Sequence, residues 1–335
     1  MSNTPIIQCI LITFVFVLLC SCQPEEKYSR LTGFTMGTTY QVTFEKNAIA
    51  PEQLQQKIDN RLEKINQLMS TYIEDSELSL FNRAHTTDCQ PISENTRFVI
   101  QNSLEVFQQT AGKFDVTLAP LIELWGFDKK QTHDAIPPQS TIDSILKQFG
   151  SQHVHIEIDC VKKDLANISI NLSAIAKGYA VDEIAKIIKA SGSQNYLVEI
   201  GGELASQGIN ARGKPWQIAI ESAVTQERAI QRIITPNGLG VATSGDYRNY
   251  FEKDGKRYSH TIDPTTGYPI THQLASITVL HPQTMLADAL ATALMVMGPD
   301  EALKFANQHQ LPIFMLVKSE DGFKEVYNDN FKPYL

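Results

Sequence analysis

The segment TMLADALATALMVMG, residues 284–298, places the strongest constraint on how this chain folds. It is apolar on nearly every side of a helix, and a helix of this composition is stable only when other elements bury it. Asp288 is its one charged residue. Because an ionised carboxylate in a core is costly unless it is paired, hydrogen-bonded or bound to a cation, we expect Asp288 to have a defined partner.

Thr292 follows Asp288 by one helical turn, so the hydroxyl and the carboxylate share one face of the predicted helix. Mg²⁺ and Ca²⁺ take oxygen ligands, and the pair therefore predicts half of a divalent-cation site. The alternative is an aspartate near the helix start that interacts with the helix dipole, while Thr292 bonds to its own backbone. The spacing alone leaves both interpretations open.

Three other segments contain groups that suit an anionic ligand or proton transfer. NLSAIAKGY, residues 171–179, passes from a strand into a helix, where backbone N–H groups and Lys177 could hold a phosphate. GVATSGDYRNY, residues 240–250, offers hydroxyl and guanidinium groups. YSHTIDPTTGYP, residues 258–269, runs from a strand into a turn and carries His260. Taken singly, these segments also describe a surface lysine, a polar turn and a hairpin end.

The remaining pattern predicts a single α+β catalytic domain over residues 32–335, because helices and strands do not alternate strictly. A mixed, largely antiparallel sheet with packed helices fits best. The composition, 42% hydrophobic and 20% charged, is that of a globular protein, and the net charge of -8 argues against nucleic-acid binding. Helices are predicted at residues 51–69, 94–110, 141–149, 174–190, 285–297 and 300–309, with Ser93 and Ser140 as N-caps. Strands are predicted at residues 39–45, 153–158, 168–172, 196–200, 216–221, 229–235, 256–262, 275–281 and 312–317.

The N-terminal segment is of a different kind. An apolar run at residues 6–19 ends in Leu-Cys-Ser-Cys, which resembles a bacterial lipoprotein box. We expect residues 1–21 to be a lipoprotein signal peptide, Cys22 to carry the lipid, and residues 22–31 to be a polar tether. A short uncleaved anchor is the alternative. Both place the folded part in the cell envelope, tied to a membrane and facing the periplasm, and leave open which membrane retains it.

Cys89 and Cys160 are the cysteines that remain in the folded part. An exported compartment permits a disulfide between them, but the sequence does not show whether they meet. No cysteine spacing typical of haem attachment or structural zinc occurs.

Eight motifs occur in an order that is specific to one family. They are TMGTTY at 35–40, STY at 70–72, KFDVT at 113–117, LWGF at 124–127, NLSAIAKGYAVD at 171–182, VEIGGE at 198–203, ATSGDYRNYFEKDGKRYSHTIDPTTGYP at 242–269 and ADALATALMVMG at 287–298. From about residue 32 to near the C-terminus, the chain resembles the ApbE family of FAD:protein FMN transferases. The resemblance implies that FAD is split at its pyrophosphate with Mg²⁺, and that FMN passes to a Thr or Ser hydroxyl of a partner protein while AMP is released.

The resemblance also implies roles for individual residues. Asp288, Thr292 and the backbone carbonyl of Ala174 match metal ligands. His260 matches the histidine that handles the acceptor's proton, which a neutral imidazole can do at physiological pH, and Asp263 with its turn would fix the loop that presents it. The implied flavin-nucleotide contacts are Met36, Tyr72, Lys113, Phe114, Asp115, Asn171, Lys177 and Ile262, with Ser244 and Arg248 near the phosphates.

Two positions depart from the family pattern. Asn171 stands where many members have aspartate, and Ala291 stands where some have a further aspartate, so the metal is expected to rely more on water and phosphate. The family implies acceptors among subunits of membrane electron-transfer complexes such as the sodium-translocating quinone reductase. The alternatives are an FAD pyrophosphatase that uses water as acceptor, a non-catalytic flavin-binding lipoprotein and a purely structural lipoprotein.

Overall fold

The largest element of the fold is an antiparallel sheet of eight strands. The computed structural model describes residues 27–47, 49–127, 136–223, 229–246, 250–253 and 256–335. In spatial order the strands are β1 (Tyr28–Thr35), β2 (Thr38–Glu45), β6 (Tyr196–Ile200), β7 (Glu203–Gln207), β10 (Gly240–Gly245), β13 (Leu274–His281), β14 (Ile313–Ser319) and β15 (Gly322–Tyr327). Every neighbouring pair in this sheet is antiparallel. The predicted α+β class with a largely antiparallel sheet is therefore confirmed.

Three small sheets accompany the large one. They consist of β3 (Gln90–Pro91), β5 (Cys160–Lys163) and β4 (Val154–Ile156), of β8 (Ile218–Glu221) with β9 (Ile230–Ile234), and of β11 (Tyr250–Lys253) with β12 (Lys256–Ser259). Cys89 and Cys160 are joined by a disulfide with their Cα atoms 5.5 Å apart. The disulfide answers the question that the sequence left open, and it ties the segment before β3 to β5.

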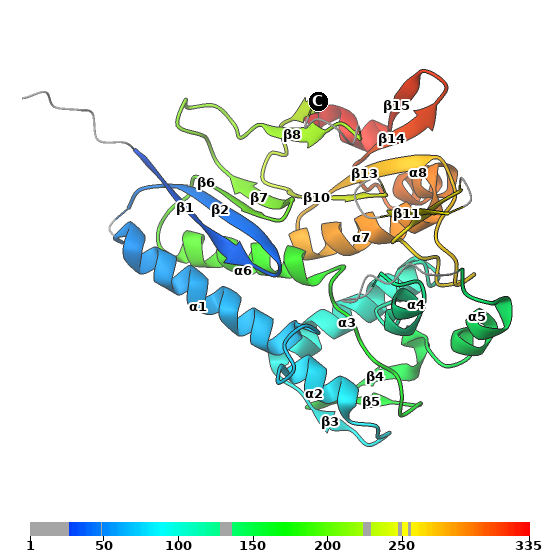
Figure 1. The fold of residues 1–335 in the computed structure, drawn as a ribbon. Coiled ribbons are helices and arrows are strands. Elements are labelled where there is room, and N and C mark those ends of the chain that lie inside the picture. The colour runs from blue at the N-terminus through cyan, green and yellow to red at the C-terminus, as the bar shows by residue number, and fades with distance from the viewer. Residues whose placement is uncertain (1–26, 48, 128–135, 224–228, 247–249, 254–255) are drawn as a thin grey trace, which may run out of the picture.

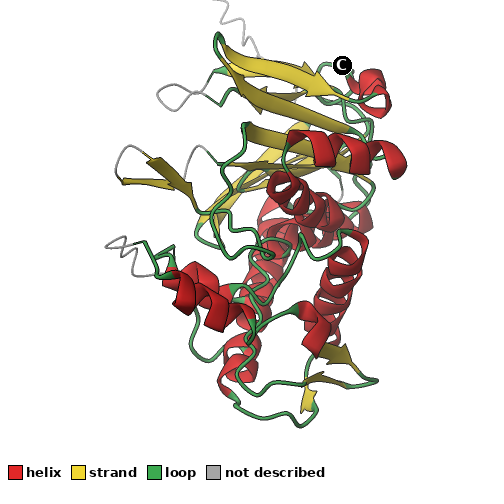
Figure 2. Ribbon diagram, turned by 90° about the vertical axis from the view of Figure 1, so that its right-hand side faces the viewer, coloured by secondary structure: helices red, strands yellow, loops and turns green. Residues whose placement is uncertain are grey.

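Most of the α-helices lie below the large sheet in Figure 1, and α8 (Pro299–Gln308) lies beside it. The others are α1 (Pro51–Met69), α2 (Glu77–Arg83), α3 (Glu94–Gln109), α4 (Ala119–Leu124), α5 (Gln139–Leu146), α6 (Ala176–Ala190) and α7 (Thr284–Met297), with 3-10 turns at Ser151–His153 and Asp329–Tyr334. Figure 1 shows α6 and α7 directly beneath the sheet and α1 and α3 further below. Figure 2 shows most of the helices below the large sheet, with helices also beside the strands at the upper right and a small sheet at the bottom. Among the described residues, no helix has the length and apolar composition required to span a membrane.

The central helix forms as its sequence predicts. Eleven of the 14 residues of α7 are buried, including Asp288. Its N-terminal N–H groups are satisfied by a residue of α6, because the Asp182 carboxylate accepts hydrogen bonds from the backbone N–H groups of Thr284 and Met285, each at 2.9 Å. The helix is thus held at its start by another helix, which leaves Asp288 free for another partner.

Several predicted boundaries are close to the observed ones. α1 has the predicted bounds, and Ser93 is the N-cap of α3, accepting a hydrogen bond from the backbone N–H of Thr96. Ser140 is not a cap, because α5 already begins at Gln139 after Pro138. β1 begins at Tyr28, inside the segment predicted as a tether, and the residues before it that were predicted as signal and lipidation site lie outside the described part of the chain.

The structure overturns one predicted strand and decides one point that the sequence left open. Residues 168–172 are not a strand, because the side-chain amide of Asn82 makes both hydrogen bonds of the Ile170 backbone, each at 2.8 Å. For the polar residues 240–245 a turn was one of the open interpretations, and the structure shows the central strand β10 instead. Their polarity is explained by hydroxyl contacts, since Thr243 Oγ1 lies 2.8 Å from Thr278 Oγ1. Hydroxyl pairs between neighbouring strands satisfy polar atoms that composition alone assigns to a turn.

Candidate active site

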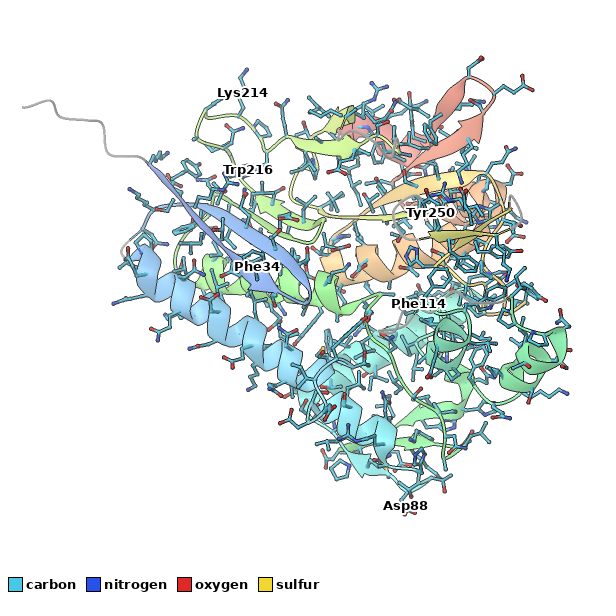
Figure 3. All side chains as sticks on the ribbon, viewed as in Figure 1. Phe34, Asp88, Phe114, Lys214, Trp216 and Tyr250 are labelled. Carbon is cyan, nitrogen blue, oxygen red and sulfur yellow. A yellow bond between two sulfur atoms is a disulfide. The ribbon has the colours of Figure 1, made fainter. Side chains whose placement is uncertain are left out.

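A cleft of about 950 Å³ opens where the large sheet meets α7 and the loops that follow α3 and β12. It brings together most of the residues singled out in the sequence: Lys113, Phe114, Asp115, Asn171, Ala174, Lys177, Ser244, His260, Ile262, Asp288 and Thr292. Phe114, labelled in Figure 3, lies between the layer that contains α7 and the helices below it. Segments that lie far apart along the chain, from Thr38 to Val296, therefore meet in one cleft.

Two other predicted contacts line a second hollow of about 980 Å³. Met36 and Tyr72 belong to this hollow, and Ser173 and Lys177 line both it and the cleft. Met36 has a positive φ of 50° in the tight turn between β1 and β2, where Gly37 has a φ of 73°. The predicted residues thus occupy two adjoining spaces with Lys177 between them, an arrangement that suits an elongated ligand. Arg248 and Cys22 lie outside the described residues.

The floor of the cleft contains two buried carboxylates and one ammonium group. Lys177 Nζ lies 2.8 Å from Glu203 Oε1 and 3.9 Å from Asp288 Oδ1. The second oxygen of Asp288 accepts a hydrogen bond from the backbone N–H of Gly178 at 3.0 Å. Among the described residues, one positive charge therefore compensates two carboxylates, which leaves the cluster negative when both are ionised and favours a further cation.

Burial governs the ionisation of this cluster. It raises the pKa of Asp288, an effect opposed by Lys177 and by the N–H of Gly178. Burial, together with repulsion from Asp288, raises the pKa of Glu203 to about 7 although Lys177 opposes the change. Burial also lowers the pKa of Lys177, but the attraction of Asp288 and Glu203 outweighs it, and the net shift is upward. Lys177 is therefore a permanent cation at neutral pH.

The oxygen atoms of this floor fit a divalent cation. Asp288 lies beyond the first turn of α7, and its hydrogen bond comes from α6, so it is not the dipole-stabilised aspartate of the alternative interpretation. Thr292 Oγ1 lies 3.4 Å from Ser244 Oγ in β10, which places the hydroxyl against the cleft wall. Glu203 Oε2 is buried without a hydrogen-bond partner among the described residues. Carboxylate and hydroxyl oxygens together with an unsatisfied carboxylate oxygen are suitable for Mg²⁺.

The loop that carries His260 is held by Asp263. Asp263 Oδ1 accepts a hydrogen bond from the backbone N–H of Thr265 at 2.9 Å, and its carbonyl accepts one from Gly267 at 2.8 Å. Lys113 Nζ, from the segment after α3, lies 3.1 Å from the Asp263 carboxylate and so contacts the turn directly. The expected role of Asp263 in fixing this loop therefore has a geometric basis. The strand predicted for residues 256–262 stops at Ser259, which leaves His260 in the loop itself.

Asp115 and Asn171 hold the cleft wall through their side chains. Asp115 Oδ1 accepts hydrogen bonds from the hydroxyls of Thr117 at 2.6 Å and Ser151 at 2.7 Å. Asn171 Oδ1 accepts one from the backbone N–H of Ser173 at 2.9 Å. Both side chains therefore shape the loops that line the cleft, whatever contacts they also make with a ligand.

Comparison with known proteins identifies the group to which this fold and cleft belong. The model of the ApbE family matches residues 36–315. The FAD:protein FMN transferase of Vibrio cholerae is 44% identical over 321 residues, which is 95% of this chain and 96% of the relative. The chain belongs to the ApbE family. This confirms the resemblance inferred from the motifs.

Other ApbE-family proteins agree with this assignment. The FAD:protein FMN transferase of Escherichia coli K12 is 38% identical over 332 residues, 96% of this chain and 95% of the relative. The structure of the flavin transferase ApbE from Vibrio cholerae superposes with a TM-score of 0.86 at 42% identity, covering 92% of this chain and 99% of that one. The apo form of the Pseudomonas stutzeri flavinyl transferase ApbE gives a TM-score of 0.85 at 39% identity, with coverage of 92% and 96%.

Among the cleft residues that sequence reasoning missed, Glu203 is the one that pairs with Lys177. Glu203 stands in the motif VEIGGE but received no role, because strand β7 was not predicted and nothing indicated which way its side chain would point. The ion pair between Lys113 and Asp263 was also not foreseen. A carboxylate directly after two glycines at a strand end was the available signal for Glu203.

Proposed function

We propose that this protein transfers the FMN portion of FAD to a Thr or Ser hydroxyl of a partner protein, with AMP as the leaving group. The observation that carries the proposal is the meeting of Asp288, Thr292 and Lys177 with His260 in one cleft of a chain that belongs to the ApbE family. In the reaction a new bond forms between the acceptor oxygen and the FMN phosphorus. The pyrophosphate bond to AMP breaks, and the acceptor's proton leaves the hydroxyl.

Each part of the cleft supports one requirement of this chemistry. Lys177 offers a permanent positive charge beside the negative pyrophosphate. Asp288, Thr292 and the carbonyl of Ala174 would hold Mg²⁺, which when bound supplies charge neutralisation at the phosphates. His260, on the loop fixed by Asp263, would accept the proton of the acceptor hydroxyl through its imidazole. No covalent nucleophile of the enzyme is needed.

The test is a transfer assay with the detergent-solubilised full chain, FAD, Mg²⁺ and a panel of candidate acceptor domains. Flavin fluorescence that stays on an acceptor band in a denaturing gel, and is lost with chelator or with Asp288→Ala, is the expected result. Free FMN and AMP with dark acceptor bands would instead identify a pyrophosphatase. FAD that stays intact with every acceptor would identify a binding protein.

We also propose that the chain is an envelope lipoprotein, lipidated at Cys22, whose acceptors are flavoprotein subunits of membrane electron-transfer complexes. The disulfide between Cys89 and Cys160 supports an oxidising compartment such as the periplasm. Expression with labelled palmitate provides the test. Label in the membrane fraction that disappears with Cys22→Ser is expected, and label that persists would contradict lipidation at this residue.

A further inference from the structure

Glu203 occupies an unusual position at the start of β7. Its side chain is 6% exposed, and Lys177 Nζ lies 2.8 Å from Oε1. Oε2 is buried and has no hydrogen-bond partner among the described residues. A buried carboxylate oxygen without a partner is costly, so the arrangement suggests a group that is satisfied only when something else occupies the cleft.

The surroundings of Glu203 indicate what that group is. The ammonium of Lys177 that holds Glu203 is also 3.9 Å from Asp288, so both carboxylates lie beside the same ammonium group at the cleft floor. Both residues line the cleft together with Thr292. If Asp288 and Thr292 contribute ligands to a cation, several of its positions remain for water, because Mg²⁺ keeps part of its hydration shell in proteins. Water bound to a cation donates strong hydrogen bonds and requires acceptors.

We infer that Glu203 is a positioning residue of the cation site, whose free oxygen accepts a hydrogen bond from a water molecule bound to the cation. Lys177 holds the other oxygen and so fixes the direction of the carboxylate. The inference rests on the cation site of the proposed function. It assigns Glu203 a part that differs from direct ligation and from serving only as the counter-ion of Lys177.

Charge supports this assignment. Two carboxylates and one ammonium give the cluster a net charge of −1 when both acids are ionised, and a divalent cation reverses that sign. A site of that charge is suited to the pyrophosphate of FAD. In Glu203→Gln the amide oxygen could still accept a hydrogen bond from Lys177. The substitution removes the negative charge, however, and puts an NH₂ group in place of the second oxygen. That NH₂ group cannot accept a hydrogen bond from water.

The test measures binding of Mn²⁺ alone, without FAD or acceptor, by electron paramagnetic resonance of the free ion with the full chain in detergent. Glu203→Gln is expected to weaken Mn²⁺ binding about 10–100-fold, the usual effect of removing an outer-shell partner of a metal. Glu203→Asp keeps the negative charge on a shorter side chain. Its Mn²⁺ affinity should fall between those of the wild type and Glu203→Gln. Asp288→Asn should have the largest effect. Thermal unfolding of each variant checks that it folds.

Glu183→Gln is the matched control, because Glu183 is a largely buried glutamate of α6 that pairs with Arg61 and does not line the cleft. It should leave Mn²⁺ binding within about twofold. If Glu203 served only to hold Lys177, Glu203→Gln would affect FAD binding and leave the Mn²⁺ affinity alone, which would overturn the inference.

The outcomes separate this inference from the proposed function. Wild-type affinity in Glu203→Gln, with loss in Asp288→Asn, would overturn the role of Glu203 and leave the cation site in place. A loss in Glu203→Gln as complete as in Asp288→Asn would overturn outer-shell placement in favour of direct ligation. If Asp288→Asn had no effect on Mn²⁺ binding, both the cation site and the role of Glu203 would be wrong.

Discussion

At the scale of single residues, the cleft depends on side chains whose charge is set by burial. Asp288 and Glu203 both have raised pKa values because they are buried, and one ammonium group lies between them. His260 differs, because it stands in a loop and its position is determined by the turn around Asp263. Burial and the neighbouring charges therefore set the ionisation of Asp288 and Glu203, whereas the geometry of the loop sets the position of His260.

For His260 we expect that His260→Ala lowers the rate of flavin transfer by about 10²–10⁴-fold, the usual contribution of a general base. FAD binding should remain, because the substitution leaves Lys177 and the floor of the cleft intact. Single-turnover transfer to an acceptor domain, with FAD affinity from fluorescence quenching, measures both. A full transfer rate in this variant would show that another group takes the proton.

For Glu203 we expect a specific pH dependence of stability in cation-free protein. The pKa of Glu203 is about 7 in the folded state and near 4.5 in the unfolded chain, so between these values the folded protein binds the extra proton. The contribution of Glu203 to the free energy of unfolding must then fall as pH rises from 4.5 to 7. Urea unfolding of wild type and Glu203→Gln should give a difference that changes across this window. A constant difference would contradict the raised pKa.

At the scale of secondary-structure elements, the crossing of α6 and α7 sets the position of Asp288, the carboxylate of the proposed cation site. Gly178 lies where the two helices touch, and a Cβ added there would be 2.4 Å from the backbone oxygen of Thr284. The N–H of the same glycine donates to Asp288. Close approach of the helices and orientation of the carboxylate thus depend on one residue without a side chain.

We therefore expect Gly178→Ala to destabilise the protein by about 1–3 kcal/mol, as overpacked cores do, and to weaken Mn²⁺ binding because Asp288 shifts. Lys189→Ala, on the exposed side of α6, is the control and should change stability by less than about 0.5 kcal/mol. Urea unfolding and Mn²⁺ titration test the two effects. Unchanged stability in Gly178→Ala would mean that the helices can separate without cost.

Long elements with a clear period were the ones that sequence could predict. α1 and α7 have regular apolar spacing and were found within one residue of their bounds. β7 and β10 were missed because their polar residues face the cleft or pair with other hydroxyls, which hides the alternation expected of a strand. The strands missed at the centre of the sheet are thus the ones that form the wall of the site.

At the scale of the whole molecule, a covalent bond holds the part furthest from the large sheet. The disulfide between Cys89 and Cys160 joins positions 71 residues apart and lies in the small sheet at the bottom of Figure 1, away from α7. Closing so long a loop restricts the unfolded chain strongly. The bond therefore affects stability more than it affects the chemistry of the cleft.

The double variant Cys89→Ser and Cys160→Ser should lose about 2–5 kcal/mol of unfolding free energy and keep its transfer activity below the unfolding temperature. Chemical denaturation of the variant measures the loss. Wild-type protein with its disulfide reduced is the control and should show a similar loss. A variant as stable as the oxidised wild type would mean that the disulfide contributes nothing to the folded state.

The sequence by itself determined the buried helix, the order of the family motifs and most of the candidate site residues, because these depend on local patterns and on residue types. Only the tertiary structure decided that Lys177 lies between Asp288 and Glu203 and that Cys89 meets Cys160. Those contacts join segments far apart in the chain. Their geometry follows from how the sheet and the helices pack, which no local pattern records.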